Sequence, residues 1–234
     1  MTRETSLGGP AAAFPETAWS TVLRAKDDGT ALGRLIERSW KPLYFFARRQ
    51  GADVETAKDR VQAFFAHLLE VRLMDRVVQG RGRFRSFLLA AFDHFLANDY
   101  RLWTAEKRGG TARPLSLDFA QAETQYLPSG DESPEDLYRR AWASDVLRAA
   151  LEALRAEIPD RFDLIRAHLL ADGPRPTYRE SARGLGVSEF EIANLLHRAR
   201  VRLGELIVLQ VRDTVEDDPQ DEVRDLLQAF RRNS

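Results

Sequence analysis

Apolar residues recur along most of the chain at intervals close to 3.6, the period of an amphipathic helix, and no stretch alternates as a half-buried strand would. We therefore expect a chain built of helices alone. The pattern predicts helices over residues 31–51, 56–70, 84–103, 137–158, 161–171 and 221–230, and two more that begin after Thr177 and Ser188.

A short turn separates the last two of these helices. Thr177 and Glu180 have the spacing of a capping box, in which each side chain bonds to the other residue's backbone amide. Gly186 stands where a tight turn needs a positive φ, and Ser188 is a good N-cap for the next helix. A helix, a tight turn and a second helix in this order predict a helix-turn-helix.

Glycine, proline and acidic residues interrupt the helical pattern over residues 109–138, which hold one Arg against six Asp/Glu. Such a segment is typical of an extended linker. We expect an all-α fold of two small helical domains joined by an acidic linker, with the helix-turn-helix in the second domain and a further helix at the C-terminus. The predicted bounds are 17–108 and 137–212 for the domains, 109–136 for the linker and 213–234 for the acidic extension.

The net charge of −1 hides an uneven distribution along the chain. Residues 17–108 hold 17 Lys/Arg against 11 Asp/Glu, a net of +6, and residues 139–212 hold 13 against 10, a net of +3. Residues 213–234 hold three against seven, a net of −4. This pattern favours contact with a polyanion, although a solvated charged face gives the same composition.

Several classes of protein are excluded by composition. The chain has no cysteine, no apolar run of the roughly 20 residues that span a bilayer, and no signal-peptide pattern at its start, so we expect a cytoplasmic protein with no membrane partner. Its four histidines have no metal-binding spacing and no phosphate-binding glycine loop follows a strand. We expect no catalytic residues, metal or cofactor, and hence a binding protein rather than an enzyme.

Two sets of residues have the chemistry for nucleic acid. The second helix of a helix-turn-helix enters the major groove, where side chains reach phosphates and base edges. Basic residues interleaved with aromatics hold single strands by stacking and phosphate contact. In each set the alternative is structural, with arginines that complement a helix dipole in the first and Phe84 as a core residue in the second. The first set is Asn194, His197, Arg198, Arg200 and Arg202. The second is the segment 81–85 with Phe84 inside it, followed by Phe87, His94, Asn98, Tyr100, Arg101, Trp103, Lys107 and Arg108.

The order of several short runs resembles bacterial RNA polymerase sigma factors of the extracytoplasmic-function group, over about residues 17–232. The runs are AWSTVL at 18–23, GRFRSFLL at 82–89, KRGG at 107–110, PLSLD at 114–118 and LHRAR at 196–200. Asp59, Gln62 and Phe65, a polar rim beside an aromatic, match the family's Asp-x-x-Gln-x-x-Phe positions.

The resemblance implies a subunit that directs promoter-specific transcription initiation. Asp59, Gln62 and Phe65 would bind the clamp of core RNA polymerase, and the linker would pass through the polymerase cleft toward the flap and RNA exit path. Promoter DNA would be read at two elements, and the family leaves room for an anti-sigma partner. The −10 element would meet Arg81, Arg83, Phe84, Arg85, His94, Asn98 and Arg101, and the −35 element Ser188, Asn194, His197, Arg198, Arg200 and Arg202.

The residues leave two alternatives to a sigma factor open. One is a free-standing helix-turn-helix regulator that binds duplex DNA without polymerase. The other is a sigma-derived protein that holds polymerase but reads promoters poorly, since Phe190, Glu191 and Leu195 depart from the family's recognition helix. The acidic C-terminal extension is a candidate for a docked regulatory helix that takes the place of an anti-sigma protein.

Overall fold

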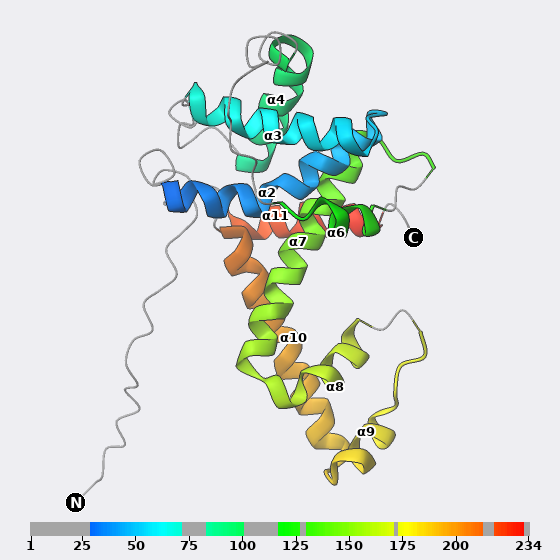
Figure 1. Ribbon diagram of the computed structural model, residues 1–234. Helices are drawn as coiled ribbons and strands as arrows, with labels where there is room; N and C mark the ends of the chain where they lie inside the picture. Colours follow the sequence, from blue (N-terminus) through cyan, green and yellow to red (C-terminus); the bar gives the residue numbers. More distant parts are fainter. Residues whose placement is uncertain are drawn as a thin grey trace, which may run out of the picture.

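The computed structural model of the protein describes residues 29–71, 83–100, 117–126, 130–170, 173–212 and 218–231. Across these residues the regular structure consists of nine α-helices and one turn of π-helix, with no strand (Figure 1). The all-α prediction is confirmed for this part of the chain.

The N-terminal helices begin and end where local chemistry dictates. Helix α2 ends before Gly51, whose φ of +93° is open to glycine and strained for other residues. Asp53 caps helix α3 by accepting a hydrogen bond from the Thr56 amide at 2.7 Å. The bounds are α2 Gly29–Arg49, α3 Val54–Glu70, α4 Phe84–His94 and the π-helix turn η2 Phe95–Asp99.

The C-terminal helices include one that the sequence pattern did not predict, a short helix inside the expected linker. Ser133 caps helix α7 through the Asp136 amide, with Pro134 in the first turn. The bounds are α6 Phe119–Thr124, α7 Pro134–Glu157, α8 Pro159–Leu169, α9 Tyr178–Leu185, α10 Glu189–Arg212 and α11 Pro219–Arg231.

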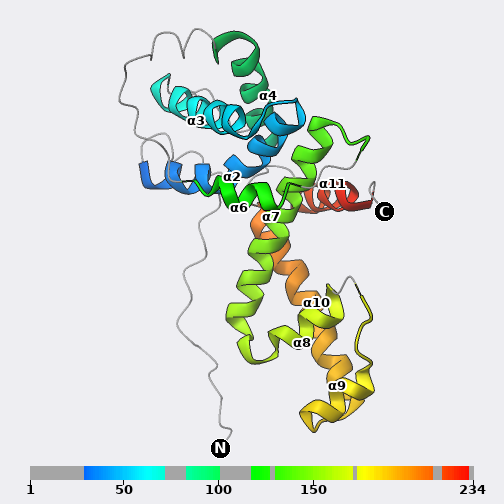
Figure 2. The same ribbon diagram turned by 45° about the vertical axis from the view of Figure 1, so that its right-hand side comes forward.

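Two hydrophobic cores form, and helices α7 and α10 contribute to both. The first half of α7 and Val211 near the end of α10 join α2, α3, α4, α6 and α11 in the first core. The second half of α7, from Ala150, and most of α10 join α8 and α9 in the second. Figures 1 and 2 show α7 and α10 side by side between the two cores. Packing therefore crosses the predicted boundary at residue 137.

The described part of the predicted linker is folded against the first core. Phe119 of α6 is buried, with its ring centroid 4.8 Å from that of Trp40 in α2. Glu123 accepts hydrogen bonds from the Tyr44 hydroxyl at 2.7 Å and from Arg48 Nη2 at 2.7 Å. Residues 119–124 are thus helical and docked on α2, where the sequence predicted an extended tether.

Candidate nucleic-acid interface

Capping boxes start both α9 and α10, and a left-handed glycine ends α9 at the turn between them. Thr177 and Glu180 form the predicted box at the start of α9. Gly186 ends α9 in the left-handed conformation, with φ +67°. Ser188 and Glu191 form a second reciprocal pair, in which the Glu191 carboxylate accepts from the Ser188 amide at 2.8 Å and the Ser188 hydroxyl accepts from the Glu191 amide at 3.2 Å. Glu191 therefore has a structural role in starting α10.

One side of α10 is buried and the other is open. Ile192, Leu196, Ala199 and Leu203 pack into the second core. The opposite side is exposed, and its most exposed large apolar residue is Phe190, with 73% of its surface accessible. We call this side the α10 face; it consists of Phe190, Asn194, His197, Arg198 and Val201. Asn194 lies four positions after Phe190, and His197 and Arg198 each lie three or four positions from both Asn194 and Val201, as one helical face requires.

The three arginines predicted near the end of the recognition helix differ in their partners. Arg198 and Arg200 are exposed, and among the described residues neither forms an ion pair. Arg202 donates to both oxygens of Glu157 at 2.7 and 2.8 Å, and to Glu205 at 2.7 Å. The hydrogen bonds to Glu157, and after them the bond to Glu205, raise the pKa of Arg202. Arg202 ties α10 to the end of α7, which leaves Arg198 and Arg200 as the cations available to an anion.

A buried histidine lies behind the turn. His168 Nε2 is 2.8 Å from the Ser181 hydroxyl of α9, and both side chains are buried. Burial lowers the pKa of His168, and the charges of Arg200 and Arg175 lower it further. The structure therefore favours a neutral imidazole that joins α8 to α9.

The residues predicted to bind polymerase lie on α3 but differ in exposure. Asp59 is exposed and Gln62 is half-buried, whereas Phe65 is 1% exposed and packs against Phe64, with ring centroids 5.4 Å apart. Only Asp59 and Gln62 therefore reach the surface in this conformation, and Phe65 contributes to the first core.

The predicted −10 residues are also separated by the fold. Phe84 is buried in the first core, as the structural alternative for that residue required. His94 and Asn98 are exposed near the π-helical turn, where the Asn98 amide donates to the His94 carbonyl at 3.2 Å. Arg81 and Arg101 lie outside the described residues.

Arg83 and Arg85, which we call the α4 arginine pair, contact the C-terminal helix. Glu222 of α11 accepts from Arg85 Nε at 2.5 Å and Nη2 at 3.1 Å, and lies 2.8 Å from Arg83 Nε. Asp225 pairs with Arg83 Nη1 at 2.6 Å and with Arg85 Nη2. Both guanidinium groups are thus held by two carboxylates from the acidic extension.

The centre of this ion cluster is buried. Arg85 is 4% exposed and Glu222 is 1% exposed. The backbone carbonyl of Arg85 also accepts a hydrogen bond at 2.9 Å from the buried Tyr138 hydroxyl of α7. The start of α4 is therefore held by α7 through its backbone and by α11 through its side chains.

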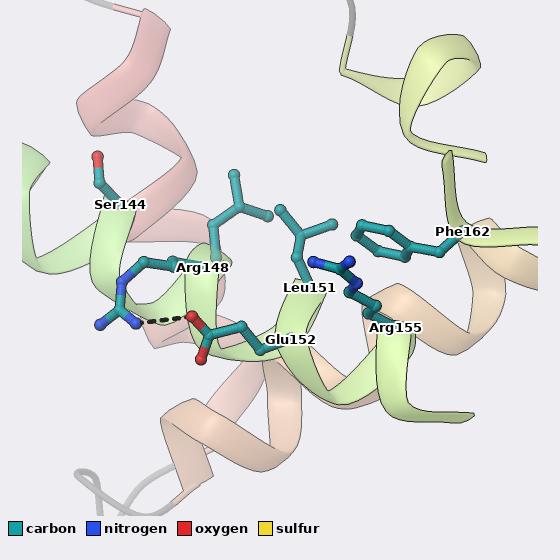
Figure 3. Close-up of a pocket in the computed structure, with 7 residues that line it drawn as sticks. Ser144, Arg148, Leu151, Glu152, Arg155 and Phe162 are labelled. Atoms are coloured by element: carbon teal, nitrogen blue, oxygen red, sulfur yellow. Dashed lines mark hydrogen bonds and ion pairs between the residues drawn. The ribbon is translucent and has the colours of Figure 1, made fainter. Parts of the chain in front are cut away.

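A shallow apolar depression lies between α7 and α8 (Figure 3). Leu147, Leu151 and Phe162 provide its apolar surface, and Arg155 lies over the Phe162 ring at 5.7 Å. Arg148 and Glu152 pair at its edge, 3.0 Å apart. The Ser144 hydroxyl, also in the lining, donates a hydrogen bond to the Arg140 carbonyl. The polar side chains of the depression are thus already engaged within the protein, and we assign no ligand to it.

Comparison with known proteins yields no match: neither a model of a protein family nor a curated protein nor a solved structure is significantly similar to this chain. No described helix is long and apolar enough to cross a membrane. Across the described residues, no three His, Cys, Asp or Glu side chains gather as a metal site would require.

Two features of the interface were missed by sequence reasoning. The Ser188–Glu191 box has the same Ser/Thr-x-x-Glu spacing as the predicted Thr177–Glu180 box and could have been found from it. Glu222 and Asp225 are three positions apart, which places them on one side of a helix. Their partners are about 140 residues away, and no local pattern could identify them.

Proposed function

We propose that the protein is a sigma-like subunit that binds core RNA polymerase and directs promoter-specific initiation. The observation that carries the proposal is the α10 face, an exposed helix surface with Asn194, His197 and Arg198 that follows a turn capped on both sides. Arg200 adds a second unpaired cation beside it. Such a surface suits the major groove of a −35 element.

The chemistry of the α10 face fits base reading. An Arg contacts guanine through two bonds and an Asn contacts adenine in the same way, so Arg198 and Asn194 have the side chains for direct readout. Phe190 can pack on a thymine methyl group from the first turn of α10. Arg200 would contact the phosphate backbone and fix the register.

The first core would supply the other contacts of such a subunit. Asp59 and Gln62 would meet the polymerase clamp, and Phe65 would support α3 from beneath. His94 and Asn98, with the α4 arginine pair, would face the single-stranded −10 element. The family resemblance adds two further partners to the proposal. The helices of the second core would contact the flap of RNA polymerase, and an anti-sigma factor would bind the subunit.

A second candidate is a regulator that binds duplex DNA without polymerase. The observation that favours it is the contrast between the open α10 face and the α4 arginine pair, which is already occupied by Glu222 and Asp225. In this conformation the surface proposed to bind duplex DNA is open, whereas the arginines proposed to meet a single strand are covered by α11.

The experiment that separates the two candidates is binding of the purified chain to bacterial core RNA polymerase, followed by promoter footprinting. Asp59→Ala/Gln62→Ala is the test variant, chosen because Phe65→Ala would damage the core. Glu55→Ala/Lys58→Ala on the same helix is the matched control, since Glu55 is exposed, Lys58 is half-buried and the two pair with each other within α3.

Tight binding that the test variant weakens and the control does not would support the sigma-like subunit. Duplex binding by the isolated chain without any polymerase binding would support the free-standing regulator. Polymerase binding with no promoter footprint would favour an interaction protein that reads promoters poorly.

A further inference from the structure

The contact between α11 and the α4 arginine pair has the geometry of anion recognition. Two guanidinium groups converge on two carboxylates, and Glu222 offers both oxygens to Arg85 Nε and Nη2. Arginine forks bind carboxylate and phosphate oxygens in the same two-bond arrangement. The carboxylates of α11 therefore stand where phosphate oxygens would bind.

Helix α11 carries its anchor and its charges on the same side. Leu226 is buried in the first core, next in sequence to Asp225 and four residues after Glu222. Asp221 and Arg224 pair with each other on the exposed side, and Leu227 is also exposed. Val223 also packs against the first core, so apolar contacts and two carboxylates together define the docked position of the helix.

The edge of the cluster is open to solvent. The side chain of Arg83 is 36% exposed and that of Asp225 is 31% exposed. A strand that approaches Arg83 can therefore meet the cluster from outside before α11 leaves, as stepwise exchange of one anion for another requires. A cluster sealed on every side would offer no such route.

We propose that α11 is an internal competitor for nucleic acid: its Glu222 and Asp225 occupy a phosphodiester-binding site formed by Arg83 and Arg85, and single-stranded nucleic acid binds there only when the helix is displaced. The inference rests on the proposed function, because it names the regulation of the same −10 surface. Only six residues separate α10 from Pro219, so the competitor is present at the high effective concentration of a short tether.

The test compares binding of a short fluorescein-labelled oligothymidylate to full-length variants by fluorescence anisotropy at low salt. Glu222→Gln/Asp225→Asn removes both clamp charges. Asp218→Asn/Asp221→Asn is the matched control, because it makes the same change of net charge at the start of α11 with two exposed residues. A third variant adds Arg83→Ala to the clamp substitutions.

We expect the clamp variant to bind the oligonucleotide at least about tenfold more tightly than the native chain, given the effective concentration of a tethered competitor. The control should change affinity by less than about threefold, and adding Arg83→Ala should remove most of the gain and lower the salt dependence by about one phosphate contact. Circular dichroism and thermal unfolding check the fold. Asp225→Asn alone keeps the ion pair between Glu222 and Arg85, so we expect a smaller increase in affinity for the oligonucleotide. This single variant replaces the double variant in the test if the double variant unfolds.

Displacement is measured directly by a spin label on α11. The chain has no cysteine, so Leu227→Cys provides a single attachment point on the exposed side of that helix. Saturating oligonucleotide should mobilise the label if the strand displaces α11.

The outcomes separate the inference from the proposed function. If the native chain binds the oligonucleotide, with an unchanged label and equal affinities for clamp and control variants, α11 is a structural element and the inference is overturned while single-strand binding stands. If neither the native chain nor any folded variant binds the oligonucleotide, both the −10 surface and its competitor are overturned. Duplex binding by the α10 face is measured separately and survives either result.

Discussion

The two arginine pairs of this protein, Arg83 with Arg85 and Arg198 with Arg200, look alike in the sequence and differ in the structure. Each is an Arg-x-Arg run beside residues suited to nucleic acid. The first pair is held by Glu222 and Asp225, whereas no described residue forms an ion pair with the second. An arginine in the sequence therefore predicts an anionic ligand only where no carboxylate of the folded chain already pairs with it.

Burial explains the difference. Arg85 lies within the first core, where an unpaired guanidinium would lose its hydration without compensation. Arg198 and Arg200 lie on the outside of α10, where water solvates them and no partner is required. Folding thus demands a partner for Arg85, and leaves Arg198 and Arg200 without ion pairs among the described residues.

Replacing one arginine from each pair gives the largest expected contrast. Arg85→Ala leaves Glu222 buried with only Arg83 nearby, and breaking a buried pair in this way costs about 3 kcal/mol of unfolding free energy. Arg198→Ala, on the surface, should change it by less than about 0.5 kcal/mol. Urea unfolding measures both, and equal effects would contradict the distinction drawn between the pairs.

For the affinity for duplex DNA, we expect the surface arginine Arg198 to matter most. Arg198→Ala should weaken binding to a cognate duplex by about 1–3 kcal/mol if the side chain reads a base. Arg202→Ala is the control on the same helix, because Glu157 and Glu205 already hold that side chain. A footprint that both variants leave unchanged removes Arg198 from the proposed interface.

A smaller effect is expected at the start of α10. Ser188→Ala removes the hydroxyl that accepts from the Glu191 amide, and loss of such a cap costs about 1 kcal/mol. Thr177→Ala at the start of α9 is the matched comparison, since it breaks the equivalent box. Thermal unfolding should show losses of similar size, and no loss in either variant would show that the caps do not stabilise the turn.

The smallest effect concerns pH and links the second arginine pair to the core. Burial first, and then Arg200 and Arg175, hold the pKa of His168 below its ordinary value, so the unfolded chain binds a proton more readily. The contribution to stability is present above the unfolded pKa of about 6.5 and is lost as the pH falls below it. Unfolding free energies at pH 7.5 and 5.5 should therefore differ more for the native chain than for His168→Gln. Arg200→Ala should raise the His168 pKa in an NMR titration, and an unchanged titration would show that Arg200 does not act on this ring.

Local features were predictable from the sequence, and distant pairings were not. The Asp53 cap, the Thr177 box and the apolar side of α10 follow from patterns a few residues long, and the structure has all three. The short helix α6 was missed because glycine and proline around it indicated a tether, whereas Phe119 is buried through tertiary packing on Trp40. Phe84 was ambiguous because a side chain beside a turn reads as core or surface until its neighbours are known. The partners of Arg83 and Arg85 required the fold itself.

Helix α7 also fixes the distance and the rotation between the two cores, because one continuous helix contributes residues to both. Leu137 and Ala143 lie in the first core and Ala150 and Leu154 in the second, on a single uninterrupted helix. A residue inserted between them would rotate one core against the other by about 100°, whereas a seven-residue insertion would nearly restore the phase and lengthen the spacing by about 10 Å. Because α10 also enters both cores beside α7, such an insertion would have to be matched by one of similar length in α10.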